Sequence, residues 1–307
     1  MAKDYLAIDV GGTNIKYGIL NRSGKLISRG SVKSDCHNLA EFYALLDKIV
    51  APNLKRIRAI AVCVPGKVDL NTGIVYFGGA LPFLHGAKIK EYLEERYGLL
   101  TGVENDGKAA ALAELWMGSL HDVPNGAVIV LGTLVGGGIV VNHQLIHGSN
   151  FQAGELSFML DHFKEKADGS ANRYVGYDCS AVGMIEKIAT ALNLPDKKDG
   201  RAAFAAIKSG QPEAVAIFQS YCYQIAQLIM NLQAVIDSER IAIGGGISSE
   251  AVLIEEIKRQ YQKLLAENPI LAQTFTPPEI VPCHFHSDAN LYGSLYALLN
   301  EWQRQLR

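Results

Sequence analysis

The chain has 307 residues, of which 49% are hydrophobic and 20% charged, and its formal net charge is -2. This length predicts two domains or one large α/β unit, and the composition excludes a disordered, collagen-like or coiled-coil chain. Because the overall field is not positive, we expect no binding to nucleic acid or to an anionic membrane.

The cysteines and the N-terminal residues indicate the compartment. The 5 cysteines are scattered without CxxC spacing, and several lie in apolar runs. The first residues lack the features of a signal peptide, and no apolar run reaches the ~18 residues that a membrane span requires. We therefore expect a soluble, cytoplasmic protein with reduced thiols.

Hydrophobic periodicity predicts the elements of the first half. They are strands at 5–10, 15–20 and 25–32, a helix at 39–50, a strand at 59–64 and helices at 87–97 and 109–116. The opening pattern then begins again with strands at 127–131 and 139–141, separated by a glycine-rich turn. Two halves that start alike predict a duplicated α/β fold with a cleft between the copies.

The second half contains more helix than the first. We predict helices at 180–192, 200–209, 212–235, 250–265 and 288–303, and strands at 240–246 and 279–282. The stretch 121–126 is the one most like a linker. We therefore expect an N-terminal domain at 1–120, joined by the C-terminal helix at 290–307, and a second domain at 121–289.

Three glycine turns each follow an apolar strand. Asp9-Val-Gly11-Gly12-Thr13-Asn14 is typical of a loop that binds phosphate through backbone amides, although a plain hairpin turn also explains it. Asp9 at the end of the strand could then hold Mg²⁺, or the water shell of the ion, against a phosphate. Gly132-Thr133 with Gly136–Gly138 forms a second such turn, and Gly244–Gly246 a third, where a flat ring such as adenine could lie against the backbone.

The segment 102–109 nearly matches the GxxxxGK[ST] loop, but Ala109 replaces the required hydroxyl. Asp106 instead lies between a predicted strand that ends near Val103 and the helix predicted at 109–116, which suits a general base that accepts a hydroxyl proton. Capping of the following helix is the alternative role. Gly66 could line the same cleft and Glu155 could bind a polyol, although both motifs also fit turns. We expect no metal site at Cys283–His286, since alternation separates the cysteine from the histidines.

Six motifs in this order resemble the ROK family of sugar kinases and related repressors. They are DVGGTN (9–14), PGKVD (65–69), ENDGKAAALAE (104–114), LGTLVGGGI (131–139), HGSNFQAGE (147–155) and IGGGIS (243–248). The resemblance implies the actin-like ATPase (ribonuclease H-like) fold, with duplicated α/β domains around a nucleotide and sugar cleft. Since no helix-turn-helix precedes Asp9, we expect the kinase branch.

The resemblance also implies roles for individual residues. Asp106 would activate the 6-hydroxyl of the sugar, with Asn105, Glu155 and Gly66 lining the sugar pocket. Residues implied to hold ATP are Gly11, Gly12, Thr13, Asn14, Gly132, Thr133, Gly245 and Gly246. Asp9 would organise Mg²⁺ through water, and the family implies a homodimer.

Two departures from the family pattern bear on metal and substrate. Phe158 stands where the family has a histidine that binds sugar and zinc, and the cysteine cluster has no counterpart at 161–178, so we expect no Zn²⁺. Gly176 falls near the place of a lost glutamate. In the family, this histidine and this glutamate face the anomeric end of the sugar. The resemblance therefore implies that the aromatic ring of Phe158 favours a sugar whose anomeric hydroxyl is substituted.

We therefore expect an ATP:sugar 6-phosphotransferase, and specifically a β-glucoside kinase acting on cellobiose-like substrates. Glucokinase, N-acetylmannosamine kinase and fructokinase are the alternatives within the class. An inactive sugar-binding regulator is the alternative of another class, and an acetate-kinase-like or chaperone member of the superfold is a third.

Overall fold

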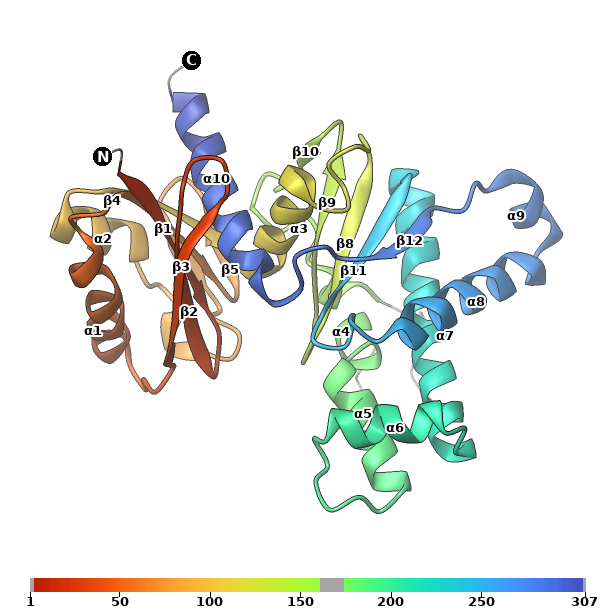
Figure 1. The fold of residues 1–307 in the computed structure, drawn as a ribbon. Helices are drawn as coiled ribbons and strands as arrows, with labels where there is room; N and C mark the ends of the chain where they lie inside the picture. Colours follow the sequence, from red (N-terminus) through yellow and green to blue (C-terminus); the bar gives the residue numbers. More distant parts are fainter. Residues whose placement is uncertain (1–2, 161–173, 306–307) are drawn as a thin grey trace. The chain divides into compact units, whose positions relative to one another are not determined.

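The computed structural model describes residues 3–160 and 174–305, and they form two compact units (Figure 1). Unit 1 comprises Met1–Gly118, Leu145–Ala153 and Ser287–Arg307, and unit 2 comprises Ser119–Gln144 and Gly154–His286. The C-terminal segment thus belongs to unit 1. Each unit is described below by itself.

Unit 1 contains a five-stranded sheet in the order β3-β2-β1-β4-β7. β1 pairs antiparallel with β2 and parallel with β4, and β4 pairs parallel with β7. The strands are β1 (Asp4–Val10), β2 (Asn14–Leu20), β3 (Leu26–Lys33), β4 (Ile57–Val64) and β7 (Leu100–Asn105). The helices are α1 (Leu39–Val50), α2 (Ile89–Tyr97), α3 (Asp106–Met117) and α10 (Ala289–Gln305), and a small hairpin, β5 (Lys67–Asp69) and β6 (Ile74–Tyr76), follows β4.

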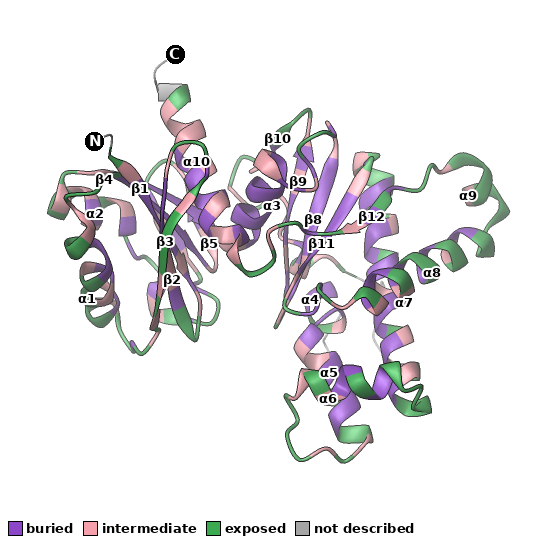
Figure 2. Ribbon diagram, in the orientation of Figure 1, coloured by how far each residue is buried: buried purple, intermediate pink, exposed green. Residues whose placement is uncertain are grey.

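Side-chain alternation sends the two faces of this sheet into different cores. Leu6 and Ile8 of β1 pack in the cluster that contains residues of α1 and α2. The alternate residues Tyr5 and Ala7 pack with Leu295 and its neighbours in α10. Because alanines occupy the α10 face of β1 and β4, that helix lies close to the sheet. Figure 2 shows β1 largely buried and the edge strand β3 largely exposed.

Unit 2 repeats this strand arrangement in the order β10-β9-β8-β11-β12. β8 pairs antiparallel with β9 and parallel with β11, which pairs parallel with β12. Its strands are β8 (Gly126–Leu131), β9 (Val135–Val141), β10 (Gln144–Leu145), β11 (Arg240–Gly245) and β12 (Glu279–Pro282). Its helices are α4 (Val175–Asp178), α5 (Ala181–Ala191), α6 (Gly200–Lys208), α7 (Pro212–Ile236), α8 (Ala251–Glu267) and α9 (Pro269–Thr274).

Most predicted elements are confirmed, but α4 and α9 were not predicted, and three further differences lie close to the predicted motifs. Gly136–Gly138 lie within β9 and pair with β8, whereas the sequence placed them in a turn. A Cβ on Gly137 would lie 2.3 Å from the Val128 carbonyl oxygen, so these glycines allow close strand approach. α3 begins at Asp106 rather than Ala109, and the β5–β6 hairpin was not predicted. No helix in the described parts of the chain is both long and apolar enough to cross a membrane.

Candidate functional site

The chemistry-bearing motifs of unit 1 lie where its parallel strands end. β1 ends at Val10, β4 at Val64 and β7 at Asn105. Carboxyl ends of neighbouring parallel strands share one edge of a sheet, and this is where α/β proteins bind ligands. The DVGGTN, PGKVD and END motifs are therefore brought together in unit 1.

The junction of β7 and α3 is organised by Asn105. Its Oδ1 accepts the N–H of Lys108 at 3.0 Å and so caps α3. Its Nδ2 lies 2.9 Å from the Gly66 carbonyl oxygen and 3.1 Å from Asp106 Oδ1. The same Asp106 oxygen accepts the N–H of Gly107 at 2.8 Å. Since Asn105 is the cap, Asp106 is not required for that role, and its half-buried carboxylate is held in a fixed orientation.

Gly66 must be a glycine on steric grounds. Its φ is 95°, and a Cβ there would lie 2.0 Å from the carbonyl oxygen of Phe77. This conformation is strained for any other residue. The turn after β4 thereby directs the Gly66 carbonyl to Asn105.

Asp9 lies on the face of the sheet that α10 covers. Its Oδ1 accepts a hydrogen bond from Asn290 Nδ2 at 2.9 Å and lies 3.5 Å from Cys63 Sγ. Burial raises the pKa of Asp9, and the bond from Asn290 and the charge of Lys16 oppose that rise. The sequence analysis missed Asn290, because it is 281 residues away and lies in a helix predicted for packing alone.

The β1–β2 loop has four residues between the paired Val10 and Ile15. The N–H of Gly11 donates to the Asn14 carbonyl at 3.1 Å, so this amide stabilises the turn itself. Gly12, Thr13 and Asn14 are exposed. The amides of Gly12 and Thr13 are therefore better placed for an anion than that of Gly11.

The β8–β9 loop of unit 2 has three residues, because Leu131 pairs with Val135. Gly132 donates its N–H to Leu134 at 3.0 Å, and its carbonyl accepts the N–H of Ala181 at 3.0 Å. The loop is thus fixed to the start of α5, while Thr133 is exposed. The two predicted phosphate loops occupy equivalent places in their sheets but form different turns.

Gly245 and Gly246 differ sharply in their surroundings. Gly245 has a φ of 98°, and a Cβ there would lie 2.0 Å from the Leu131 carbonyl oxygen. A Cβ on Gly246 would meet nothing within 4 Å. Gly245 is therefore required by the fold, whereas the surface at Gly246 is open.

Glu155 and Phe158 lie on a segment fixed to β9. Glu155 directly precedes the short helix η3 (Leu156–Phe158). Ser157 Oγ accepts the Val135 N–H at 3.0 Å and donates to the Val135 carbonyl at 2.7 Å. Phe158 is 63% exposed. A Cβ on Gly176 would lie 2.8 Å from Ser157 Oγ, so α4 packs tightly against η3 and leaves no room for a side chain at 176.

Across the described residues, no group of three His, Cys, Asp or Glu side chains is arranged to hold a metal ion. Residues 161–173, which cover most of the stretch where we expect no zinc, lie outside that part of the chain. In the Cys283–His286 segment the cysteine is buried and the rings of His284 and Phe285 pack edge to face.

One polar pair beside the site was also missed. His147 Nε2 lies 2.8 Å from Glu104 Oε2 in unit 1. Both residues belong to quoted motifs, but nothing in the sequence signals that they pair across 43 residues. The predicted sites thus fall into a unit 1 group around Asp9, Asn105 and Asp106 and a unit 2 group around Gly132, Glu155 and Gly245.

Comparison with known proteins places this geometry in a family. The model of the ROK family matches residues 5–301. A β-glucoside kinase of Listeria innocua serovar 6a is 29% identical over 301 residues, covering 97% of this chain and 98% of the relative. A β-glucoside kinase of Klebsiella pneumoniae is 32% identical over 247 residues, covering 78% of this chain and 81% of the relative.

A solved structure supports the same relationship. The ROK family protein of Streptococcus pneumoniae TIGR4 in complex with sucrose has a TM-score of 0.86 and 28% identity, covering 98% of this chain and 99% of that one. The duplicated actin-like ATPase fold expected from the sequence is confirmed by this likeness and by the matching sheet orders of the two units.

Proposed function

This chain belongs to the ROK family, and we propose that it transfers the terminal phosphate of ATP to the 6-hydroxyl of a β-glucoside. The broader activity, ATP-dependent sugar phosphorylation, follows from relatives that are named sugar kinases across nearly the whole chain. The observation that carries the site assignment is the pair of bonds from Asn105 to Gly66 and Asp106.

We assign Asp106 as the general base. Its carboxylate lies in the first turn of α3, where the helix dipole favours negative charge. Two donors, Asn105 Nδ2 and the Gly107 N–H, fix Oδ1 and so orient the carboxylate. Phosphoryl transfer depends on such positioning and on charge neutralisation more than on covalent chemistry.

The residues proposed to bind sugar hydroxyls are Asn105, Glu155 and Gly66. Both Nδ2 hydrogens of Asn105 are engaged within the protein, so its first role is to hold Asp106. Its Oδ1 keeps a second lone pair for a sugar hydroxyl. The half-buried Glu155 and the turn at Gly66 complete the proposed pocket.

The residues proposed to bind ATP phosphates are Gly12, Thr13, Gly132 and Thr133. Exposed backbone amides in glycine turns suit anions. Gly246, with open space around it, would border the adenosine. Gly11, Asn14 and Gly245 would stabilise these loops. The Gly11 N–H donates to the Asn14 carbonyl, and Gly245 lies against the Leu131 carbonyl.

Asp9 fits a Mg²⁺ ion that is bound mainly by water and nucleotide. Mg²⁺ commonly uses one or two carboxylates plus substrate phosphates rather than a cage of protein ligands. Asp9 offers one carboxylate at a strand end, adjacent to the proposed phosphate loop. The ion would neutralise charge on the phosphates.

The β-glucoside preference is supported by Phe158 and Gly176. The exposed ring of Phe158 can pack against a second sugar or an aryl aglycone, and Gly176 offers no polar side chain for a free anomeric hydroxyl. The relative in complex with sucrose holds an α-linked glucoside, which supports a substituted anomeric carbon but not the β anomer. Two relatives are named β-glucoside kinases.

We further propose a cytoplasmic homodimer. All five cysteines are free and buried, as is usual in a reducing compartment. The dimer rests on the family resemblance and is tested by sedimentation.

The test is a coupled ADP-release assay with Mg-ATP and glucose, cellobiose, salicin, N-acetylmannosamine or fructose. Higher kcat/KM on cellobiose and salicin than on glucose supports the proposal. A preference for a free sugar would contradict the β-glucoside assignment. Binding without turnover on every sugar would indicate a regulator.

A further inference from the structure

Glu104 carries a carboxylate that is almost completely enclosed. Its side chain is 3% exposed, and it lies on β7 immediately before Asn105 and Asp106. A buried carboxylate is costly unless it is paired and hydrogen-bonded. Glu104 has both kinds of partner: Oε1 accepts the backbone N–H of Asn105 at 2.8 Å, and Oε2 lies 2.8 Å from His147 Nε2.

The bond from Glu104 acts on the residue that orients the proposed base. Cys63 pairs with Glu104 across the sheet, and both side chains lie on the face that α10 covers. The side chain of Asn105 points the other way, to Gly66. The bond from Glu104 toward the site is the one to the Asn105 backbone. Glu104 acts on the backbone of Asn105. By holding the backbone N–H in place, it fixes the direction in which the Asn105 side chain leaves the strand.

His147 brings a second segment to this carboxylate. It belongs to Leu145–Ala153, which is part of unit 1. The segment folds on itself, because the His147 carbonyl accepts the N–H of Ala153 at 3.1 Å. The chain continues directly into Gly154 and Glu155. Pairing with Glu104 thus anchors the loop that leads to the proposed sugar ligand.

We propose that Glu104 and His147 are positioning residues, which hold Asn105 and Asp106 in the orientation that phosphoryl transfer needs. This inference rests on the proposed function. Removing His147 would take away the side-chain partner of Glu104 and would weaken the hold of Glu104 on the backbone N–H of Asn105. The expected consequence is a loss in kcat, with little change in the KM for ATP.

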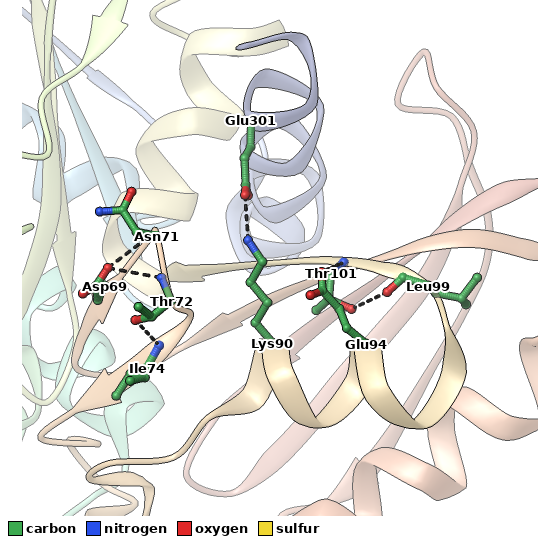
Figure 3. A network of polar contacts seen from close by, with 9 residues as sticks. All are labelled: Asp69, Asn71, Thr72, Ile74, Lys90, Glu94, Leu99, Thr101 and Glu301. Atoms are coloured by element: carbon green, nitrogen blue, oxygen red, sulfur yellow. Dashed lines mark hydrogen bonds and ion pairs between the residues drawn. The ribbon is translucent and has the colours of Figure 1, made fainter. Parts of the chain in front are cut away.

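The other end of β7 supplies a matched control. Glu94 of α2 accepts the backbone N–H of Thr101 at 3.0 Å (Figure 3). This bond has the same chemistry on the same strand but lies away from Asp106. Glu94→Ala and His147→Ala therefore each remove one side chain that supports β7, and only the second is expected to affect turnover.

The experiment compares kcat, KM and melting temperature for His147→Ala, Glu104→Gln and Glu94→Ala. Glu104→Gln keeps a carbonyl oxygen for the Asn105 N–H, but its NH₂ group then faces His147, whose Nε2 can accept only without its proton. This variant should therefore lose kcat, but less than His147→Ala. His147→Ala should lose kcat by about 10- to 100-fold, the usual cost of misplacing a reacting group. Glu104 and His147 line a cavity of about 490 Å³, so added imidazole should partly restore the activity of His147→Ala.

Equal kcat in His147→Ala and Glu94→Ala would overturn the proposal and leave a purely structural pair. A crystal structure of His147→Ala gives a readout independent of turnover. The distance from Asn105 Nδ2 to Asp106 Oδ1 should lengthen, and an unchanged distance would contradict the inference. If the wild-type protein phosphorylates no sugar, the proposed function fails, while this structural comparison still decides whether the pair positions Asp106.

Discussion

Asn105 Nδ2 lies 3.1 Å from Asp106 Oδ1, so the residue that caps α3 also orients the proposed base beside it. A helix cap would normally contribute only stability. Here the same side chain also holds the Gly66 turn, which couples the start of α3 to the end of β4. The stability of this junction and the orientation of Asp106 therefore both depend on the side-chain amide of Asn105.

Asn105→Ala should separate these two contributions when it is compared with Asn38→Ala. Asn38 caps α1 through the N–H of Glu41 at 3.0 Å and lies outside the proposed site. Asn38→Ala should cost about 1 kcal/mol in the free energy of unfolding. Asn105→Ala should cost more, because it also removes the partly buried bond to the Gly66 carbonyl. Only Asn105→Ala should lower kcat, by about 10- to 100-fold. Urea denaturation and the coupled assay measure the two effects, and equal kcat in both variants would contradict the role of Asn105.

Gly245→Ala and Gly246→Ala should behave in opposite ways. A Cβ at 245 would overlap the Leu131 carbonyl at a φ of 98°, so we expect a loss of roughly 2 kcal/mol or more in unfolding free energy. Gly246→Ala should leave stability within about 0.5 kcal/mol, because its surroundings are open. If adenosine packs there, Gly246→Ala should raise the KM for ATP. An unchanged KM would remove Gly246 from the nucleotide site.

Phe158→Ala tests the proposed aglycone contact. We expect kcat/KM for cellobiose to fall by roughly 10-fold relative to glucose, in line with an apolar pocket contact of about 1–3 kcal/mol. Ile270→Ala on α9 is the control, since Ile270 is 71% exposed in the same unit. A parallel loss on both sugars would show that Phe158 does not select the substrate.

The pH dependence of stability should change in Glu256→Gln. Burial opposes ionisation of Glu256, but hydrogen bonds from Arg259 and Gln260 outweigh it, so its pKa is lowered. The ionised form thus stabilises the fold above the unfolded pKa of about 4.3, and the contribution is lost as the pH falls through the lower folded pKa. At pH 7 the variant should be less stable by about 0.5–1 kcal/mol. Melting curves from pH 7 to pH 3 should converge, and a gap that persists at low pH would contradict this assignment.

The sequence predicted the elements well where apolar runs end in glycine or polar residues. β12 and α1 match their predicted ranges, and α7 is one residue longer than the predicted helix at 212–235. It failed for Gly136–Gly138, because their place in β9 depends on how closely β8 approaches, which periodicity does not encode. The β5–β6 hairpin is short, and three-residue strands give too little alternation to be recognised.

Site residues within one motif were easier to predict than partners far apart in the chain. Asn105 and Asp106 stand together in the sequence, so their place at a strand end was predictable. Asn290 reaches Asp9 only because α10 covers one face of the unit 1 sheet. Likewise, the pair of Glu104 and His147 exists only once Leu145–Ala153 joins unit 1. Such contacts arise from tertiary packing, which a single sequence does not specify.

The central claim is tested most directly by identifying the product formed from ATP and cellobiose by the wild-type protein and by Asp106→Asn. Mass spectrometry and NMR should show one phosphate on a 6-hydroxyl of the disaccharide for the wild type. The variant should keep its melting temperature and lose turnover by roughly 100-fold or more, the range expected for a general base. A wild-type reaction without phosphorylated sugar, or an Asp106→Asn variant with undiminished turnover, would contradict the assignment.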